Sequence, residues 1–304
     1  MKIPQLPALT TLQNPAVRHL VWLLHSPQLI SGTDVFVPGQ WLTEQMLERL
    51  LNWNSQPETA PALLQAIPPR RLGLYFESLY AVLMADLLGW HLLARNLPIR
   101  ERGRTLGELD FVLLNPHSGE VEHHEVAIKF YLGYAASVSD PALWYGPNPH
   151  DRLDLKSANL RDHQIQRSAL PAARAALTAQ GIDAPVQRRL CMPGYLFYPL
   201  DSDINPPSQA DAAHCRGSWL YRDQVHRLDI ANWLPLHKPH WIGPWVDSQG
   251  PDPQGVQAVL QQIDSSATPR LFARLQRTDS GLWCEAERFF VVPPHWPKDQ
   301  PKNQ

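Results

Sequence analysis

The chain has 304 residues, with a hydrophobic fraction of 44%, a charged fraction of 18% and a formal net charge of −2 at pH 7. This length suffices for one large domain or two smaller ones, and the composition excludes a disordered or fibrous protein. Because positive charge is not in excess, the composition argues against a nucleic-acid packaging protein, and any contact with nucleic acid must come from a local basic patch.

The first 70 residues are expected to form a helical segment. Helices are predicted over residues 14–26 and 41–53, and the second has apolar side chains at helical spacing. A longer helix is predicted over residues 69–96, where a mostly apolar run ends just before Pro98.

Two strands joined by a turn are predicted next, in the stretch GELDFVLLNPHSGEVEHHEVAIKF. The first strand covers residues 108–114 and the second residues 120–132, because Asn-Pro and Ser-Gly pairs between them are typical of a turn. A helix over residues 152–181, broken at Pro171, and a strand over residues 186–200 follow.

This order of helix, strand, strand, helix and strand predicts an α/β protein with a mixed-sheet core flanked by helices over residues 71–200. Residues 1–70 form its helical N-terminal preface. Residues 201–304 are rich in Pro and Trp. We expect them to form a β-containing C-terminal extension, packed on the core and ending in a hairpin of residues 270–276 and 282–292.

The cysteines and the apolar runs favour a cytoplasmic protein. Cys191, Cys215 and Cys284 are odd in number and widely spaced, which suits a reducing compartment better than a disulfide framework. The apolar run near the N-terminus is too short and too late for a signal peptide. Charged residues interrupt the most apolar window, residues 72–94, so we expect no membrane span.

Glu77 lies on an apolar stripe of the long predicted helix. The residues at helical spacing around it are Gly73, Ala81, Met84 and Leu88. A carboxylate on such a stripe is costly unless it is paired, hydrogen-bonded or bound to a metal ion. The alternative is an ordinary ion pair with Arg70 or Arg71.

The period of a β-strand places Asp110, Glu125 and Lys129 on one side of the predicted hairpin. The other side already supplies apolar residues for a core. The same charges would also suit a solvent-facing sheet with cross-strand ion pairs, so the hairpin pattern alone leaves both interpretations open.

Two carboxylates beside a lysine suit phosphodiester hydrolysis. Mg²⁺ takes oxygen ligands, usually one or two carboxylates together with water and substrate phosphate oxygens. Such an ion activates water and polarises phosphorus, and a nearby lysine orients water or offsets developing charge.

This arrangement resembles the PD-(D/E)XK nuclease superfamily, with its restriction-endonuclease-like core. More closely, the stretches RRLGLYFESL, GELDFVLLN, HHEVAIKFYLG and YGPNPHDRLDLK resemble the bacterial proteins grouped as domain of unknown function 1853, which has been placed in that superfamily. The resemblance implies that Asp110 and Glu125 are ligands of Mg²⁺ or Mn²⁺, that Glu77 is the acid of the first helix, which completes the metal site, and that Lys129 is the lysine.

The spacing Glu125-x-x-x-Lys129 departs from the usual acid-x-Lys, with Ala127 at the place of the usual acid. In a continuous strand it separates the two residues by about 13 Å, at roughly 3.3 Å per residue. In one explanation Ala127 replaces the usual acid and Glu125 acts as the ligand from a neighbouring position. In a second, Glu125 is the ligand and the long side chain of Lys129 reaches back to it. In a third, the site has degenerated and no longer cleaves nucleic acid. A bulge would ease the first two arrangements.

Gln164 lies on the packed stripe of the following helix, with Leu153, Ser157 and Leu160 at helical spacing. We expect it to approach the hairpin, as a helix glutamine does in the RecB-like branch that this part of the chain resembles, although that branch has Tyr where this chain has Ser168. A structural role for Gln164 is the alternative. Arginines and a lysine near the hairpin could supply the local basic patch: Arg100, Arg102, Arg104, Arg152, Lys156, Arg161 and Arg167.

His123 and His124 fall on opposite faces of a strand, so they cannot easily share a metal ion, and we interpret both as structural or surface residues. The leading hypothesis is therefore a Mg²⁺-dependent nuclease acting on DNA or RNA, with Glu77, Asp110, Glu125, Lys129 and Gln164 at its site. The alternative is a non-catalytic protein that binds nucleic acid or protein on a degenerate nuclease fold.

Overall fold

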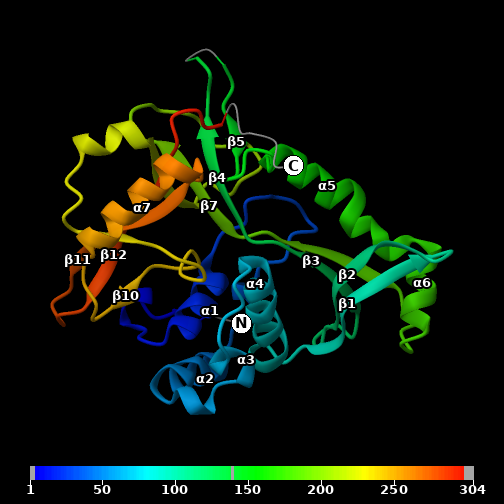
Figure 1. The fold of residues 1–304 in the computed structure, drawn as a ribbon. Helices are drawn as coiled ribbons and strands as arrows, with labels where there is room; N and C mark the ends of the chain where they lie inside the picture. The colour runs from blue at the N-terminus through cyan, green and yellow to red at the C-terminus, as the bar shows by residue number, and fades with distance from the viewer. Residues whose placement is uncertain (1–3, 138–139, 298–304) are drawn as a thin grey trace. The chain divides into compact units, whose positions relative to one another are not determined.

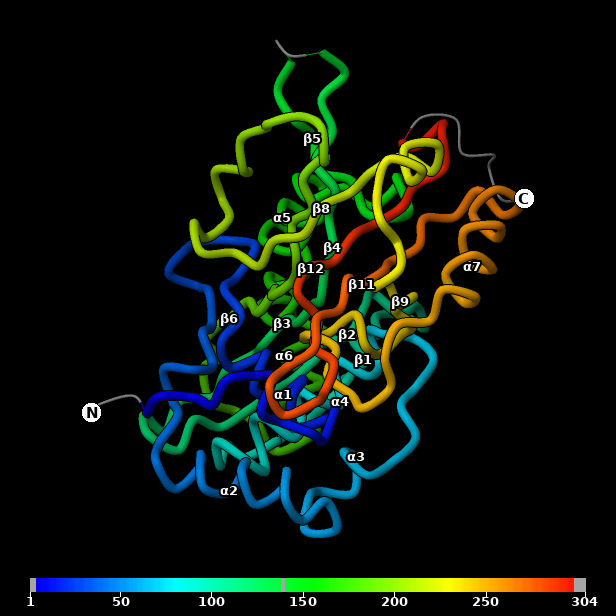
Figure 2. The backbone as a smooth tube through the Cα atoms, turned by 90° about the vertical axis from the view of Figure 1, so that its left-hand side faces the viewer, coloured from blue at the N-terminus to red at the C-terminus, as the bar shows by residue number. Residues whose placement is uncertain are grey.

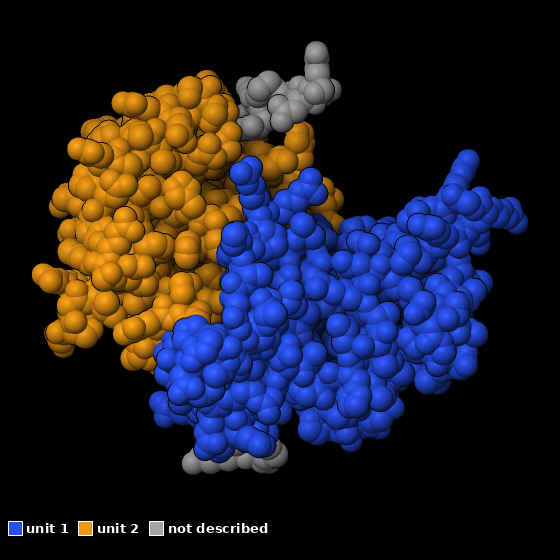
Figure 3. All heavy atoms as spheres, turned by 60° about the horizontal axis from the view of Figure 1, so that its bottom comes forward, with its two compact units in different colours: residues 1–6, 30–128, 156–193 blue, residues 7–29, 129–155, 194–304 orange. Residues whose placement is uncertain are grey.

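The structure is a computed structural model that describes residues 4–137 and 140–297 (Figure 1). The chain divides into two compact units, coloured separately in Figure 3. Unit 1 takes residues 1–6, 30–128 and 156–193, and unit 2 takes residues 7–29, 129–155 and 194–304. Each unit has its own sheet, and the fold is mixed α/β with N-terminal helices and C-terminal strands.

Unit 1 contains a four-stranded mixed sheet in the order β1-β2-β3-β6. The strands are β1 His91–Glu101, β2 Arg104–Leu114, β3 Val121–Val126 and β6 Val186–Cys191. The first three are antiparallel neighbours, and β3 pairs with β6 in parallel. Helix α6 packs against β1, and this side of the unit has a buried core that includes Ile99, Val112, Ala173 and Leu177.

The helices of unit 1 are α2 Glu44–Ser55, α3 Ala62–Gln65, α4 Leu72–Ala81 and α6 Pro171–Thr178, and α5 Leu153–Asn159 ends within it. Thr43 caps α2 by accepting a hydrogen bond from the Met46 N–H, which is why the predicted second helix forms where it does. The predicted break at Pro171 is confirmed, since α6 begins there.

The long helix predicted over residues 69–96 is shorter than expected. Helix α4 continues as a π-helical segment over Val82–Leu87 and then stops. Gly89 follows with φ of 72°, a left-handed conformation that suits glycine, and β1 begins at His91. Residues 91–96 pair with β2 instead of extending the helix, and this tertiary pairing overrides a helix-like local sequence.

The second predicted strand, residues 120–132, is two strands. Strand β3 ends at Val126, and β4 Lys129–Tyr134 belongs to the sheet of unit 2. The predicted strand 186–200 divides in the same way into β6 and β7 Gly194–Pro199. Lys129 and Gly194 are ladder partners in the sheet of unit 2, where a side chain at Gly194 would collide with the Lys129 carbonyl. Pro193 before it has no N–H to donate to a ladder.

Unit 2 contains an eight-stranded sheet in the order β5-β4-β7-β8-β12-β11-β9, with β10 paired to β12. Its remaining strands are β5 Leu143–Tyr145, β8 Cys215–Tyr221, β9 Trp233–Pro235, β10 Val246–Asp247, β11 Arg270–Arg277 and β12 Trp283–Val292. The predicted C-terminal hairpin is confirmed, since β11 and β12 pair antiparallel.

Among the described residues, two α-helices lie wholly within unit 2. Helix α1 Pro15–His25 begins after Asn14, whose side chain accepts hydrogen bonds from the Ala16 and Val17 N–H groups. Helix α7 Pro253–Ser266 packs against β9 and β11, and Figure 2 shows it beside both strands. Its apolar face, with Val256, Leu260 and Ile263, joins Phe272 in a buried core.

Candidate functional site

Strand β3 buries four consecutive polar side chains at the centre of the unit 1 sheet. Glu122 is 2% exposed, and His123, His124 and Glu125 have no exposed surface. Because side chains alternate along a strand, they form two pairs on opposite faces. His123 Nε2 lies 3.1 Å from Glu125 Oε1, and His124 Nε2 lies 2.9 Å from Glu122 Oε2.

The Glu122 and His124 pair is part of a closed polar network. The Tyr80 hydroxyl of α4 lies 2.6 Å from His124 Nδ1, and Glu122 also accepts hydrogen bonds from Asn115 and Arg189. Burial lowers the pKa of His124, so the ring is neutral, accepts from Tyr80 and donates to Glu122. We interpret the polar network on this face as structural, because it links α4 to the sheet.

On the other face, both oxygens of Glu125 have neighbours that fix the carboxylate. Oε1 faces His123, and Oε2 accepts a 3.0 Å hydrogen bond from Gln164 Nε2. Gln164 lies at the end of a π-helical segment, Leu160–Gln164, that continues α5. Its amide oxygen accepts from Lys156 Nζ at 2.8 Å and from Asn159 Nδ2 at 3.0 Å, which fixes the amide orientation.

Asp110 lies next to Glu125 on the neighbouring strand. The paired positions of β2 and β3 run from Leu114 with Val121 to Phe111 with His124, and one further step places Asp110 opposite Glu125. Asp110 is half-buried and its Oδ2 accepts a 3.0 Å hydrogen bond from the Val126 N–H. Burial, followed by the charges of Glu125 and then Glu77, raises the pKa of Asp110 to about 7.

Glu77 contributes charge to this site but is bonded elsewhere. Its carboxylate lies 3.5 Å from Arg95 Nη2 and accepts a 3.3 Å hydrogen bond from Asn96, both on β1. The ion pair suggested with Arg70 or Arg71 is therefore replaced by one with Arg95. Phe111 and Leu109, which flank Asp110 on β2, pair with the two neighbours of Asn96 on β1. Glu77 therefore approaches the site from the β1 side.

The structure does not bring Lys129 onto the hairpin with the two acids. Lys129 is the first residue of β4, and its Nζ lies 2.5 Å from Asp151 Oδ2, which also receives support from the Tyr131 hydroxyl at Oδ1. All three of these residues belong to unit 2. The strand ends at Val126, and the Ala127 N–H donates to the Cys191 carbonyl, so the expected common face stops before Lys129.

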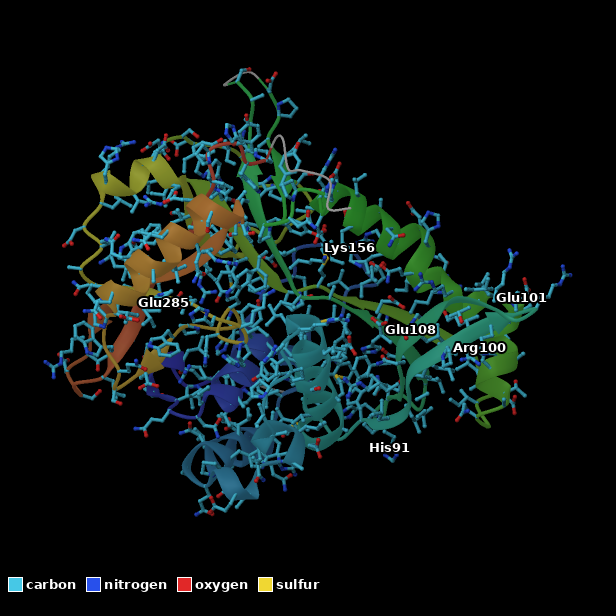
Figure 4. All side chains as sticks on the ribbon, viewed as in Figure 1. His91, Arg100, Glu101, Glu108, Lys156 and Glu285 are labelled. Atoms are coloured by element: carbon cyan, nitrogen blue, oxygen red, sulfur yellow. The ribbon has the colours of Figure 1, made fainter. Side chains whose placement is uncertain are left out.

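The basic residues near the hairpin differ in their surroundings. Arg161 is bonded to Asp34, and Arg152 to Asp154, so their charges are matched locally. Arg167 packs against β2 at Gly107, where φ is 149° and a side chain would collide with the guanidinium. Three arginines are exposed toward the tip of the β1-β2 hairpin, where Figure 4 labels Arg100 and Glu101: Arg100, Arg102 and Arg104.

The acids of this site suit a hard divalent cation that takes only a few of its ligands from the protein. In the described part of the chain, no three or more His, Cys, Asp or Glu residues gather closely enough to hold a metal ion. Two neighbouring carboxylates without a bonded lysine or arginine remain, Asp110 and Glu125, and Mg²⁺ commonly binds through one or two carboxylates plus water. These two residues could hold such an ion.

The sequence alone does not place three contributors at this site: it indicates a structural or surface role for His123 and a basic patch for Lys156, and it does not single out Asn159. His123, Lys156 and Asn159 fix Glu125, directly or through Gln164. The alternating pattern Glu-His-His-Glu is the available signal for His123, because each histidine then faces an acid two residues away. Figure 4 shows Lys156 on the α5 helix and Glu108 on β2.

Comparison with known proteins gives one family. The model of a family described as domain of unknown function (DUF1853) matches residues 18–292. No curated protein and no solved structure matches the chain. Over residues 4–137 and 140–297, none of the helices has the length and apolar character required to cross a membrane.

Proposed function

The chain belongs to the DUF1853 family, and on that premise we propose that it is a Mg²⁺- or Mn²⁺-dependent nuclease of the PD-(D/E)XK type. Its reaction is the hydrolysis of phosphodiester bonds in nucleic acid. Unit 1 would then be a restriction-endonuclease-like core, with a mixed sheet between helices and the acids on its two central strands.

One observation supports this function most directly. Asp110 and Glu125 lie side by side in the sheet, their charges disfavour one another, and neither carboxylate is bonded to a lysine or arginine in the described part of the chain. Two adjacent carboxylates that no lysine or arginine matches are costly in a protein interior. A bound divalent ion would remove that cost.

The residues of the site have separable roles in this proposal. Asp110 and Glu125 would hold the ion, which when bound activates water and polarises the phosphate. Gln164 and His123 keep both oxygens of Glu125 in place, and the Val126 N–H orients Asp110. Glu77 adds negative charge beside Asp110.

Lys129 is proposed to position the attacking water, as the family resemblance implies. Its ammonium is bonded to Asp151 in this structure, so that role requires it to leave or share this partner. The exposed arginines of the β1-β2 hairpin are proposed to bind the phosphate backbone.

The test is cleavage of plasmid DNA, single-stranded DNA and RNA with Mg²⁺ or Mn²⁺, comparing the wild type with Asp110→Ala and Glu125→Gln. We expect the wild type to cut at least one substrate. Each variant should lose at least the roughly 10–100-fold that loss of a group supporting a metal ligand typically costs. Equal activity of wild type and Asp110→Ala on every substrate would reject the nuclease.

A second function is favoured by the Lys129 and Asp151 pair. If that pair and the ion pair of Glu77 with Arg95 are permanent, the acids have become structural, and the protein binds nucleic acid or protein without cutting. Retained binding of labelled DNA or RNA with no cleavage under any metal condition would support this alternative.

A further inference from the structure

Unit 2 contains a cavity of about 1150 Å³ that no residue of the proposed nuclease site lines. Its walls come from the loop after β5, the segment after β9, helix α7 and the start of β11. Pro235, Leu236 and Leu271 give it a buried apolar wall, and the partly exposed Trp241 lies beside them. The volume is slightly above the roughly 300–1,000 Å³ of most small-molecule sites, and the mixture of apolar wall and polar groups is typical of them.

The charge of the cavity lining is positive. Lys238 and Arg270 both line it, and neither is bonded to a carboxylate within the described residues; Lys238 has the indole of Trp241 as a neighbour, 4.9 Å from its Nζ. The acid in the lining is Asp151, which Lys129 already matches at 2.5 Å. Two cations of the cavity are therefore left without an anion.

These two cations act on one another. Lys238 is exposed as a residue, yet partial burial within the cavity and then the charge of Arg270 lower its pKa. Two like charges held near each other, without a protein partner, are an arrangement that a bound dianion stabilises. An arginine beside a lysine also offers the donors that phosphate oxygens prefer.

From this cavity we propose that unit 2 binds a small phosphorylated molecule. Its phosphate contacts Lys238 and Arg270, and its organic part lies against Leu236, Leu271 and Trp241. A phosphate monoester has a charge of about −1.5 to −2 at pH 7, which matches the two unpaired cations, and a carboxylate would match only one. The cavity is larger than inorganic phosphate alone requires, which leaves room for the organic part of the molecule.

The test is isothermal titration calorimetry of the full chain in EDTA, with adenosine 5′-monophosphate, inorganic phosphate and adenosine as probes. We expect adenosine monophosphate to bind, inorganic phosphate to bind more weakly and adenosine to give no measurable heat. The double variant Lys238→Met and Arg270→Gln should bind the phosphorylated probes at least tenfold more weakly. Arg277→Gln, at the exposed far end of β11, is the control for the loss of one positive charge elsewhere in unit 2 and should bind like the wild type.

The single variant Lys238→Met keeps the test valid if the double variant does not fold, because Lys238 is exposed and its replacement should not disturb folding. It should also bind the phosphorylated probes more weakly than the wild type. Asp110→Asn should bind the probes like the wild type, which separates this cavity from the proposed nuclease site. The proposal is overturned if neither phosphorylated probe binds at millimolar concentration, if the double variant binds as well as the wild type, or if adenosine binds as tightly as its monophosphate.

Discussion

The side-chain amide of Gln164 donates a 3.0 Å hydrogen bond to Oε2 of Glu125, a carboxylate with no exposed surface. The two residues are 39 positions apart in the chain. The opposite end of the same amide accepts from Lys156 and Asn159, so a flipped amide would place its NH₂ against two donors. Glu125 is thus oriented by a neutral donor at Oε2, while Oε1 faces His123 Nε2 at 3.1 Å.

Gln164→Leu should destabilise the protein because it leaves Oε2 of a buried carboxylate without a donor. We expect the free energy of unfolding at pH 7 to fall by about 1–3 kcal/mol. Urea denaturation followed by circular dichroism measures this difference. Gln180→Leu, at an exposed position after α6, is the control and should change stability by less than about 0.5 kcal/mol. A Gln164→Leu variant as stable as its control would mean that water replaces the amide.

Asp110 should make the metal-free protein less stable as pH rises from 4 to 8. Its pKa is about 7 in the folded protein against an ordinary value of 3.8, so between these values the folded state binds more protons than the unfolded state. The free energy of unfolding therefore falls through this window and levels off above it. Asp110→Asn has no such charge, and its side chain can still accept from the Val126 N–H.

We expect Asp110→Asn to be about 1–2 kcal/mol more stable than the wild type at pH 8 in EDTA, and to differ little at pH 4. This is less than the full shift would give, because the side chain is half-exposed and solvent screens it. Urea denaturation at the two pH values measures the difference, with the exposed Asp162→Asn as control. The same gain for Asp110→Asn at both pH values would contradict the raised pKa.

Mg²⁺ should reverse this loss of stability at pH 8. An ion that binds only the folded state at ten times its dissociation constant adds about 1.4 kcal/mol to the free energy of unfolding. The wild type should gain this in Mg²⁺ relative to NaCl of equal ionic strength, and Asp110→Asn and Glu125→Gln should gain almost nothing. Thermal melting with and without EDTA provides the measurement. An equal gain in all three proteins would place the ion elsewhere.

The relation of Asp110 to Glu125 could be predicted from the sequence because it depends on local rules. Both lie in regular strands joined by a turn with clear signals, and the period of two then fixes which side chains share a face. The approach of Gln164 was also accessible, since helical spacing placed it on a packed stripe, although the actual backbone there is π-helical.

The position of Lys129 could not be predicted in the same way. The run from Glu125 to Leu132 is continuous and mostly apolar, and nothing in it marks the end of β3 at Val126. Lys129 pairs instead with Gly194, 65 positions later, which approaches the Lys129 carbonyl too closely for any side chain, and the local sequence does not indicate so distant a partner. Strand β1 was missed for a related reason, because its pairing with β2 outweighs a helix-like sequence after Gly89.

Lys129→Met separates a catalytic role of this lysine from a structural one, with Asp151→Asn as its matched partner. Both variants break the same ion pair, which is partly exposed, with side chains 22% and 34% accessible. Each should lower the free energy of unfolding by no more than about 1 kcal/mol.

Their effects on cleavage should differ. If Lys129 positions water, Lys129→Met loses about 100-fold or more of the rate, and Asp151→Asn keeps its rate or gains, because the ammonium is released from its partner. Initial rates on the best substrate, measured under conditions where both variants are fully folded, decide this. Equal rates for Lys129→Met and the wild type would leave Lys129 a structural residue of unit 2 and would require another group to orient the water.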